Sequence, residues 1–135
     1  MSELALIIED DPDLSYIFAE ALKAATYETE IVMDGQEARR RLRLSVPKLI
    51  ILDMHLPNVS GGDLLYLIRN DARLRNTIVM IATADARMGE TYTDQADYVL
   101  IKPIAFSQLR DLAIRLHGGK TGAKKQIGPE QEEEK

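Results

Sequence analysis

Short apolar runs alternate with amphipathic segments along this chain. The runs predict five strands, at residues 4–8, 28–33, 48–52, 78–82 and 98–101. Apolar positions at the spacing of one helical face predict helices between and after them, at residues 12–25, 34–44, around 64–68 and at 106–116. Strands alternating with helices indicate a parallel sheet that is covered by helices on both faces and joined by right-handed crossovers.

Two helix starts carry recognisable capping residues. Pro12 suits the first helical position, because its missing N–H would have no intrahelical partner there, and this makes Asp11 the N-cap. Asp34, with Glu37 three residues later, resembles a capping box. We expect Ala38, Leu42 and Leu44 to face inward on that second helix. We therefore expect its arginines to lie on the solvent-exposed face of the helix rather than to form an anion-binding site.

The last 18 residues differ in composition from the rest. Residues 118–135 contain one aliphatic side chain larger than alanine, a basic cluster and an acidic end, so they lack the apolar surface needed to fold. We therefore predict one domain over residues 1–117 and a disordered C-terminal tail or linker over residues 118–135.

Composition narrows the class of protein. With 135 residues the chain suffices for one core, and no apolar run approaches the roughly 20 residues of a membrane span. The net charge of −5 argues against direct binding to nucleic acid, which needs basic residues at the phosphates. The absence of cysteine and of a signal-like N-terminus is compatible with a cytoplasmic location.

Chemically versatile side chains follow four of the predicted strands. Glu9 and Asp10 follow the first strand, Asp53 the third, Thr83 the fourth and Lys102 the fifth. Ligands of open parallel sheets bind beyond the carboxyl ends of the strands, where the winding direction reverses. If the four strands are neighbours, three carboxylates, a hydroxyl and an ammonium meet there.

Three neighbouring carboxylates stay ionised at neutral pH if a cation compensates their charge. Mg²⁺ suits such a site, since it prefers oxygen ligands at about 2.1 Å and keeps several waters. One carboxylate can then attack phosphorus and form an aspartyl phosphate. Lys102 and Thr83 would stabilise the phosphoryl oxygens.

Four stretches resemble the signature segments of response regulator receiver domains, in order: IIEDDPDL, LIILDMHLPNVSGG, MIATAD and DYVLIKPI. The resemblance implies a flavodoxin-like α/β fold, with a five-stranded parallel sheet in the order 2-1-3-4-5 between layers of helices. It implies that Glu9 and Asp10 hold Mg²⁺ with Asp53 and the backbone carbonyl of His55. It also implies that Thr83 is the switch hydroxyl and Lys102 the phosphate-binding lysine.

The resemblance further implies a function in two-component phosphorelay signalling. A sensor histidine kinase or a histidine phosphotransfer protein would donate a phosphoryl group from phosphohistidine to Asp53, the phosphoacceptor. The domain would catalyse its own phosphorylation and dephosphorylation rather than act as a metabolic enzyme. It would signal through contacts with a downstream protein, and it could dimerise on phosphorylation. Pro103 would follow a cis peptide bond.

Two features depart from the family pattern. Val99 stands three residues before Lys102, where the family often has a switch aromatic residue, and the adjacent Tyr98 should point to the opposite face of the sheet. The stretch between Thr83 and Lys102 has 18 residues, about one helical turn fewer than usual. We expect the helix in residues 84–95 to be short, irregular or mobile, with Met88 and Tyr92 facing inward.

Other functions remain to be weighed. A phosphorylation-independent scaffold is the main alternative, since the unusual fourth helix could hold one conformation. An aspartyl phosphatase of the haloacid dehalogenase type would have an aspartate two residues after the nucleophile, where His55 stands. A flavodoxin-like cofactor site would have a hydroxyl-rich loop in place of EDDPD, and no GxxxxGK[ST] segment of a P-loop is present.

Overall fold

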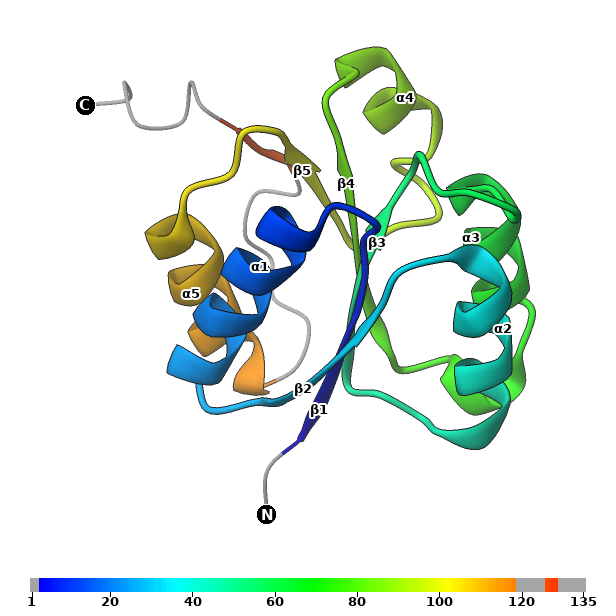
Figure 1. The fold of residues 1–135 in the computed structure, drawn as a ribbon, viewed down its shortest axis with the longest axis horizontal. Coiled ribbons are helices and arrows are strands. Elements are labelled where there is room, and N and C mark those ends of the chain that lie inside the picture. The colour runs from blue at the N-terminus through cyan, green and yellow to red at the C-terminus, as the bar shows by residue number, and fades with distance from the viewer. Residues whose placement is uncertain (1–2, 119–125, 129–135) are drawn as a thin grey trace.

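The chain forms a parallel sheet between two layers of helices in the computed structural model, which describes residues 3–118 and 126–128 (Figure 1). The strand order is β2-β1-β3-β4-β5-β6, and every neighbouring pair is parallel. The strands are β1 Leu4–Ile8, β2 Glu28–Val32, β3 Leu49–Asp53, β4 Ile78–Thr83, β5 Tyr98–Ile101 and β6 Gln126–Ile127. The predicted five-strand order is therefore confirmed.

The sheet has one strand more than the sequence indicates. Strand β6 pairs with β5 and lies within the segment predicted to be a disordered tail. Two residues are too few to give a periodic signal, and the edge of β5 supplies the partner that they need. Residues 119–125 and 129–135 of that tail lie outside the described residues.

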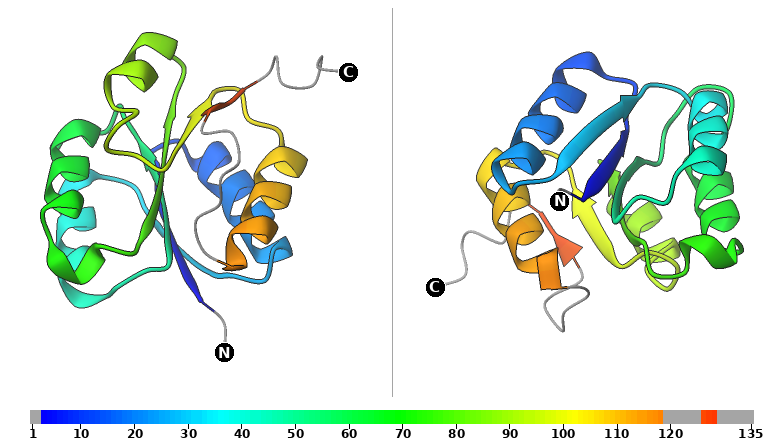
Figure 2. Two further views of the ribbon diagram at one scale, coloured as in Figure 1. Left: turned by 180° about the vertical axis from the view of Figure 1, so that it is seen from behind. Right: turned by 90° about the horizontal axis from the view of Figure 1, so that it is seen from below.

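The helices divide between the two faces of the sheet (Figure 2). Helices α1 and α5 pack against each other on one face, while α2, α3 and α4 lie on the other. Their bounds are α1 Pro12–Ala24, α2 Gly35–Leu44, α3 Gly61–Arg69, α4 Ala86–Thr91 and α5 Phe106–Arg115, and short 3₁₀ turns span Ala72–Leu74 and Leu116–Gly118.

Each face of the sheet has its own core, because successive side chains of a strand point to opposite faces. In β1, Ala5 and Ile7 pack under α1 and α5, whereas Leu6 and Ile8 pack under α2 and α3. All four side chains are inaccessible to solvent. Continuous apolar runs are thus the expected sequence of these strands, since both faces are covered.

The caps confirm the predicted helix starts. The Asp11 side chain accepts hydrogen bonds from the backbone N–H groups of Asp13 and Leu14, with Pro12 in the first turn. Asp34 accepts from the N–H of Glu37 at 3.0 Å. One expectation for α2 is wrong: Leu44 is 71% exposed, because it follows the buried Leu42 by two residues and therefore points to roughly the opposite side of the helix.

The helix expected to be short has six residues, Ala86–Thr91. Met88 and Tyr92 are partly buried and pack against the core under α2 and α3, as predicted. Among the helices of residues 3–118 and 126–128, none is long and apolar enough to span a membrane.

Candidate functional site

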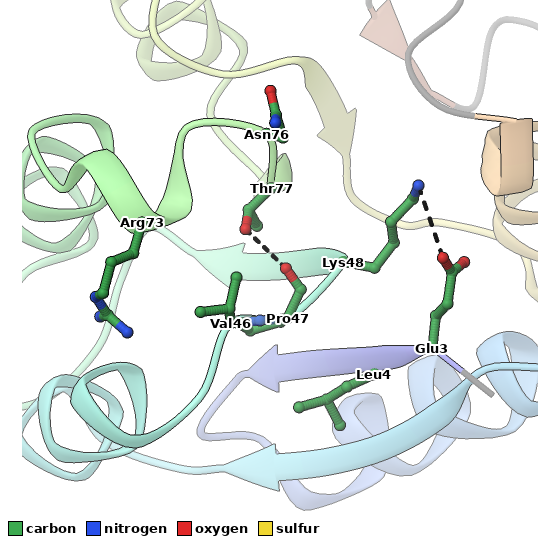
Figure 3. A pocket seen from close by; sticks show the side chains of 8 residues that line it. All are labelled: Glu3, Leu4, Val46, Pro47, Lys48, Arg73, Asn76 and Thr77. Atoms are coloured by element: carbon green, nitrogen blue, oxygen red, sulfur yellow. Dashed lines mark hydrogen bonds and ion pairs between the residues drawn. The ribbon is translucent and has the colours of Figure 1, made fainter. Parts of the chain in front are cut away.

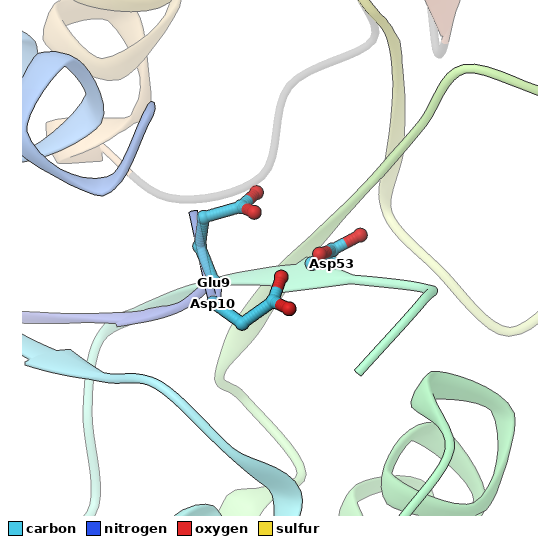
Figure 4. A group of neighbouring side chains, drawn as sticks. All are labelled: Glu9, Asp10 and Asp53. Atoms are coloured by element: carbon cyan, nitrogen blue, oxygen red, sulfur yellow. The ribbon is translucent and has the colours of Figure 1, made fainter. Parts of the chain in front are cut away.

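Side chains from four strands meet at the carboxyl end of the sheet. Strands β1, β3, β4 and β5 are consecutive neighbours, and their parallel direction brings their carboxyl ends to the same side. The carboxylates of Glu9, Asp10 and Asp53 point toward one another there (Figure 4). Each offers an oxygen within 4.8 Å of the others, so the acidic cluster expected from the sequence is present.

Glu9 is the most constrained member of this cluster. It is 1% exposed, and its Oε2 accepts a hydrogen bond from the N–H of Asp11 at 3.2 Å. Its Oε1 is buried without a hydrogen-bond partner in the described part of the chain. Burial raises the pKa of the Glu9 carboxyl from 4.5 to about 7, and the negative charge of Asp53 adds to the rise.

Lys102 supplies positive charge to the cluster. Its Nζ lies 3.2 Å from Oε1 of Glu9, as an ion pair without hydrogen-bond geometry, and 3.5 Å from Oδ1 of Asp53. One ammonium therefore pairs with two of the three carboxylates of the cluster. Its backbone is anchored, because its N–H donates to the carbonyl of Thr83 at 2.9 Å, and the Lys102–Pro103 peptide bond is cis.

Asp53 ends β3 and is 2% exposed. Its Oδ1 accepts a hydrogen bond from the backbone N–H of His55 at 3.1 Å, which keeps the following loop against the cluster. The side chain of His55 is exposed. The assignment of the His55 carbonyl as a metal ligand stays a prediction.

Gly61 has a packing role that the sequence analysis missed. A Cβ atom at this position would lie 2.6 Å from Cα of Met54 and 2.8 Å from the carbonyl oxygen of Asp53. Both neighbours are backbone atoms next to the candidate nucleophile, so a side chain here would force that backbone to move. The pair of glycines after Ser60, the N-cap of α3, is the signal in the sequence.

Thr83 is buried, and its hydroxyl is engaged by the start of α4. Its Oγ1 accepts a hydrogen bond from the N–H of Asp85 at 3.0 Å and lies 3.9 Å from Sδ of Met88. The hydroxyl is thus linked to the start of α4. Its role as a switch residue stays a prediction.

Val99 lies beneath α4. It is buried in the core under α2 and α3, while Tyr98 is buried in the opposite core, as the alternation along a strand predicts. A Cβ atom on Gly89 of α4 would come within 2.7 Å of Cγ1 of Val99. The small residues at these two positions let α4 approach β5 closely.

A separate pocket of about 490 Å³ lies at the opposite, amino end of the strands (Figure 3). Its charged side chains have partners nearby. Lys48 lies 3.8 Å from Glu3, Arg73 pairs with Asp71 at 2.9 Å, and the hydroxyl of Thr77 donates to the carbonyl of Pro47 at 2.7 Å. This pocket lacks the concentrated, partly compensated charge of the acidic cluster.

Residues 5–114 match the family model of the response regulator receiver domain. The chain belongs to this receiver family. The polar-differentiation response regulator DivK of Brucella ovis is 33% identical over 90 residues, which cover 67% of this chain and 73% of DivK.

Solved structures of receiver domains have the same fold as this chain. The receiver domain of a signal transduction histidine kinase from Syntrophus aciditrophicus superposes with a TM-score of 0.78 and 30% identity, covering 91% of this chain and 96% of that one. The receiver domain of the sensor histidine kinase PA1611 from Pseudomonas aeruginosa, solved with magnesium in its active site cleft, gives 0.78 and 24%, covering 88% and 100%. At that identity, the second likeness speaks for the fold alone.

The donor set of this receiver domain fits a hard divalent cation. Three carboxylates offer oxygen ligands, a buried oxygen of Glu9 lacks a hydrogen bond, and Lys102 compensates part of the charge. Asp10 is exposed, so solvent can reach the cluster from its side. That exposure suits Mg²⁺, which keeps several of its waters when it binds to proteins.

Proposed function

We propose that this receiver domain accepts a phosphoryl group on Asp53 in a reaction that depends on Mg²⁺. The convergence of Glu9, Asp10 and Asp53, with Lys102 beside them, carries the proposal. Glu9, Asp10, Asp53 and the carbonyl of His55 would hold the ion. When bound, Mg²⁺ would supply positive charge that lowers the repulsion between the carboxylates and the incoming phosphoryl oxygens.

The residues of the chain have separate tasks in this reaction. A carboxylate oxygen of Asp53 attacks phosphorus, and the bond from phosphorus to the leaving nitrogen of phosphohistidine breaks. The electron pair of that bond stays on the imidazole. Lys102 already lies 3.5 Å from Asp53, where its ammonium can pair with a phosphoryl oxygen. Thr83 would donate its hydroxyl proton after releasing its present contacts at α4.

The proposed donor is a sensor histidine kinase or a histidine phosphotransfer protein. Receiver domains act in two-component systems with such proteins, and the acidic cluster lies at an open edge of the sheet where a phosphohistidine can approach. The downstream signal would pass through protein contacts, with dimerisation on phosphorylation as one form of output.

Small phosphodonors test the proposal directly. Incubation with acetyl phosphate and Mg²⁺ should add one phosphoryl group, detected by intact-protein mass spectrometry, and peptide mapping should locate it at Asp53. Asp53→Asn should abolish the addition, whereas Asp71→Asn, a matched change at the amino end of the strands, should not. If the wild-type chain gains no phosphoryl group and shows no NMR change with beryllofluoride, the phosphorylation-independent scaffold becomes the better explanation.

A further inference from the structure

A short segment near the C-terminus covers the edge of β5. Strand β6 lies beside β5 (Figures 1 and 2). The two strands are parallel, with Gln126 opposite Val99 and Ile127 opposite Leu100. An uncovered edge strand presents unpaired N–H and C=O groups that can pair with another extended segment. The segment of residues 126–128 therefore occupies a position at which strand addition takes place.

The two side chains of β6 have different surroundings. Ile127 is partly buried against the core under α1 and α5, the same core that contains Leu100. Gln126 is exposed. In strand addition, main-chain hydrogen bonds provide affinity and alternate side chains provide specificity. The resident segment thus places an aliphatic side chain against the core and a polar side chain in solvent one position earlier.

Gln108 adds a side-chain contact to this arrangement. Its Nε2 donates to the carbonyl of Gly128 at 3.4 Å, and its Oε1 accepts from the N–H of Ala105 at 3.1 Å. One amide therefore joins the segment to the first turn of α5. Residues 126–128 are thus attached both to β5, by strand pairing, and to α5, through Gln108. The loop that connects β5 to α5 begins with Lys102.

We propose that the edge of β5 is a docking surface for an extended segment, and that residues 126–128 of the same chain occupy it until a partner protein replaces them. The partner binds with a parallel strand that places an aliphatic side chain opposite Leu100 and a polar one opposite Val99. Replacement is feasible because the resident strand has two residues and one anchoring side chain. This inference is independent of phosphorylation.

Competition in the full-length chain tests the surface. The probe is a fluorescent peptide with the sequence of residues 123–130, AKKQIGPE, monitored by fluorescence anisotropy. In wild type the resident segment competes with the peptide. Ile127→Asp removes the anchor of that segment, so the peptide should bind this variant at least tenfold more tightly. Ile114→Asp, the same change at an exposed position of α5, should behave as wild type.

Two further measurements complete the test. Hydrogen exchange at the amides of residues 99–101 should accelerate in Ile127→Asp and not in Ile114→Asp. Ile127→Ala, a milder change in the resident segment alone, should increase peptide affinity in the same direction by a smaller factor, and it serves as the test if Ile127→Asp folds poorly. Equal binding of the peptide to wild type and both variants would overturn the proposal. A concentration-dependent wild-type dimer that Ile127→Asp abolishes would overturn the assignment to the same chain.

Discussion

Charged side chains are paired less completely at the carboxyl end of the sheet than at the amino end. At the carboxyl end, three carboxylates lie together, one lysine pairs with two of them, and a buried oxygen of Glu9 lacks a hydrogen bond within the described residues. At the amino end, a pocket of about 490 Å³ is lined by side chains that pair at the surface, such as Lys48 with Glu3. Concentrated charge that the fold leaves partly uncompensated is what favours the carboxyl end as the candidate site.

Removing the acidic ligands should give the largest effect. The double variant Glu9→Gln, Asp10→Asn should bind Mg²⁺ roughly a thousandfold more weakly, because two anionic oxygen ligands are lost. Isothermal titration calorimetry measures the affinity. Glu3→Gln, at the amino end, serves as the control, and a similar loss there would show that the metal does not bind at the acidic cluster.

The pKa of Glu9 predicts how stability depends on pH without metal. Because the folded protein raises this pKa from 4.5 to about 7, the folded state binds more protons than the unfolded state between these values. The free energy of unfolding should therefore fall as pH rises from 4.5 to 7, by about 3 kcal/mol at most from this group. Urea denaturation in EDTA at pH 5 and pH 8 measures it. Glu9→Gln should lack this contribution, and an identical pH dependence in both proteins would contradict the prediction.

Two lysines provide a matched comparison between the ends. Lys102→Ala should lower the free energy of unfolding by about 2 kcal/mol in metal-free protein at pH 8, because the buried Glu9 and Asp53 lose their counter-charge. Mg²⁺ should restore part of this loss. Lys48→Ala removes a more exposed pair and should cost at most about 0.5 kcal/mol. If denaturant titrations gave the two variants the same loss in the free energy of unfolding, the two ends of the sheet would not differ in the way proposed.

Thr77 tests whether the amino end is structural. Thr77→Val keeps the shape of the side chain but leaves the carbonyl of Pro47 without the 2.7 Å hydrogen bond. We expect a loss of about 1 kcal/mol in the free energy of unfolding and no change in Mg²⁺ affinity. A weaker affinity of this variant for Mg²⁺ would instead show that the amino end of the sheet influences metal binding at the carboxyl end.

The smallest effect is expected at His55. Its exposed side chain follows Asp53 by two residues, where it can crowd or order water near the phosphorylated carboxylate. His55→Ala should therefore accelerate decay of the phosphorylated form by about twofold, a barrier change well below 1 kcal/mol. The decay of radiolabelled protein after removal of the phosphodonor gives the rate. An unchanged rate would leave the His55 side chain without a role.

Residues next to the strands were predictable, whereas distant contacts were not. Glu9, Asp53 and Lys102 follow continuous apolar runs, and parallel strands bring such positions together. Two contacts depend instead on how α4 packs on the sheet. They are the hydrogen bond from the N–H of Asp85 to Thr83 and the close approach of Gly89 to Val99. Leu44 was expected to face inward only because it is apolar, whereas its spacing of two residues from Leu42 places it on roughly the opposite side of the helix.

The sequence by itself determined where the five main strands lie and which residues follow their carboxyl ends, while their order 2-1-3-4-5 came from the resemblance to receiver domains. It could do so because strands buried on both faces must be apolar, and the chain direction sets which residue follows each one. The tertiary structure alone decided that Glu9 is buried enough for its pKa to rise, and that residues 126 and 127 pair with β5. Desolvation and strand pairing depend on neighbours that are far away in the chain, which a local pattern does not contain.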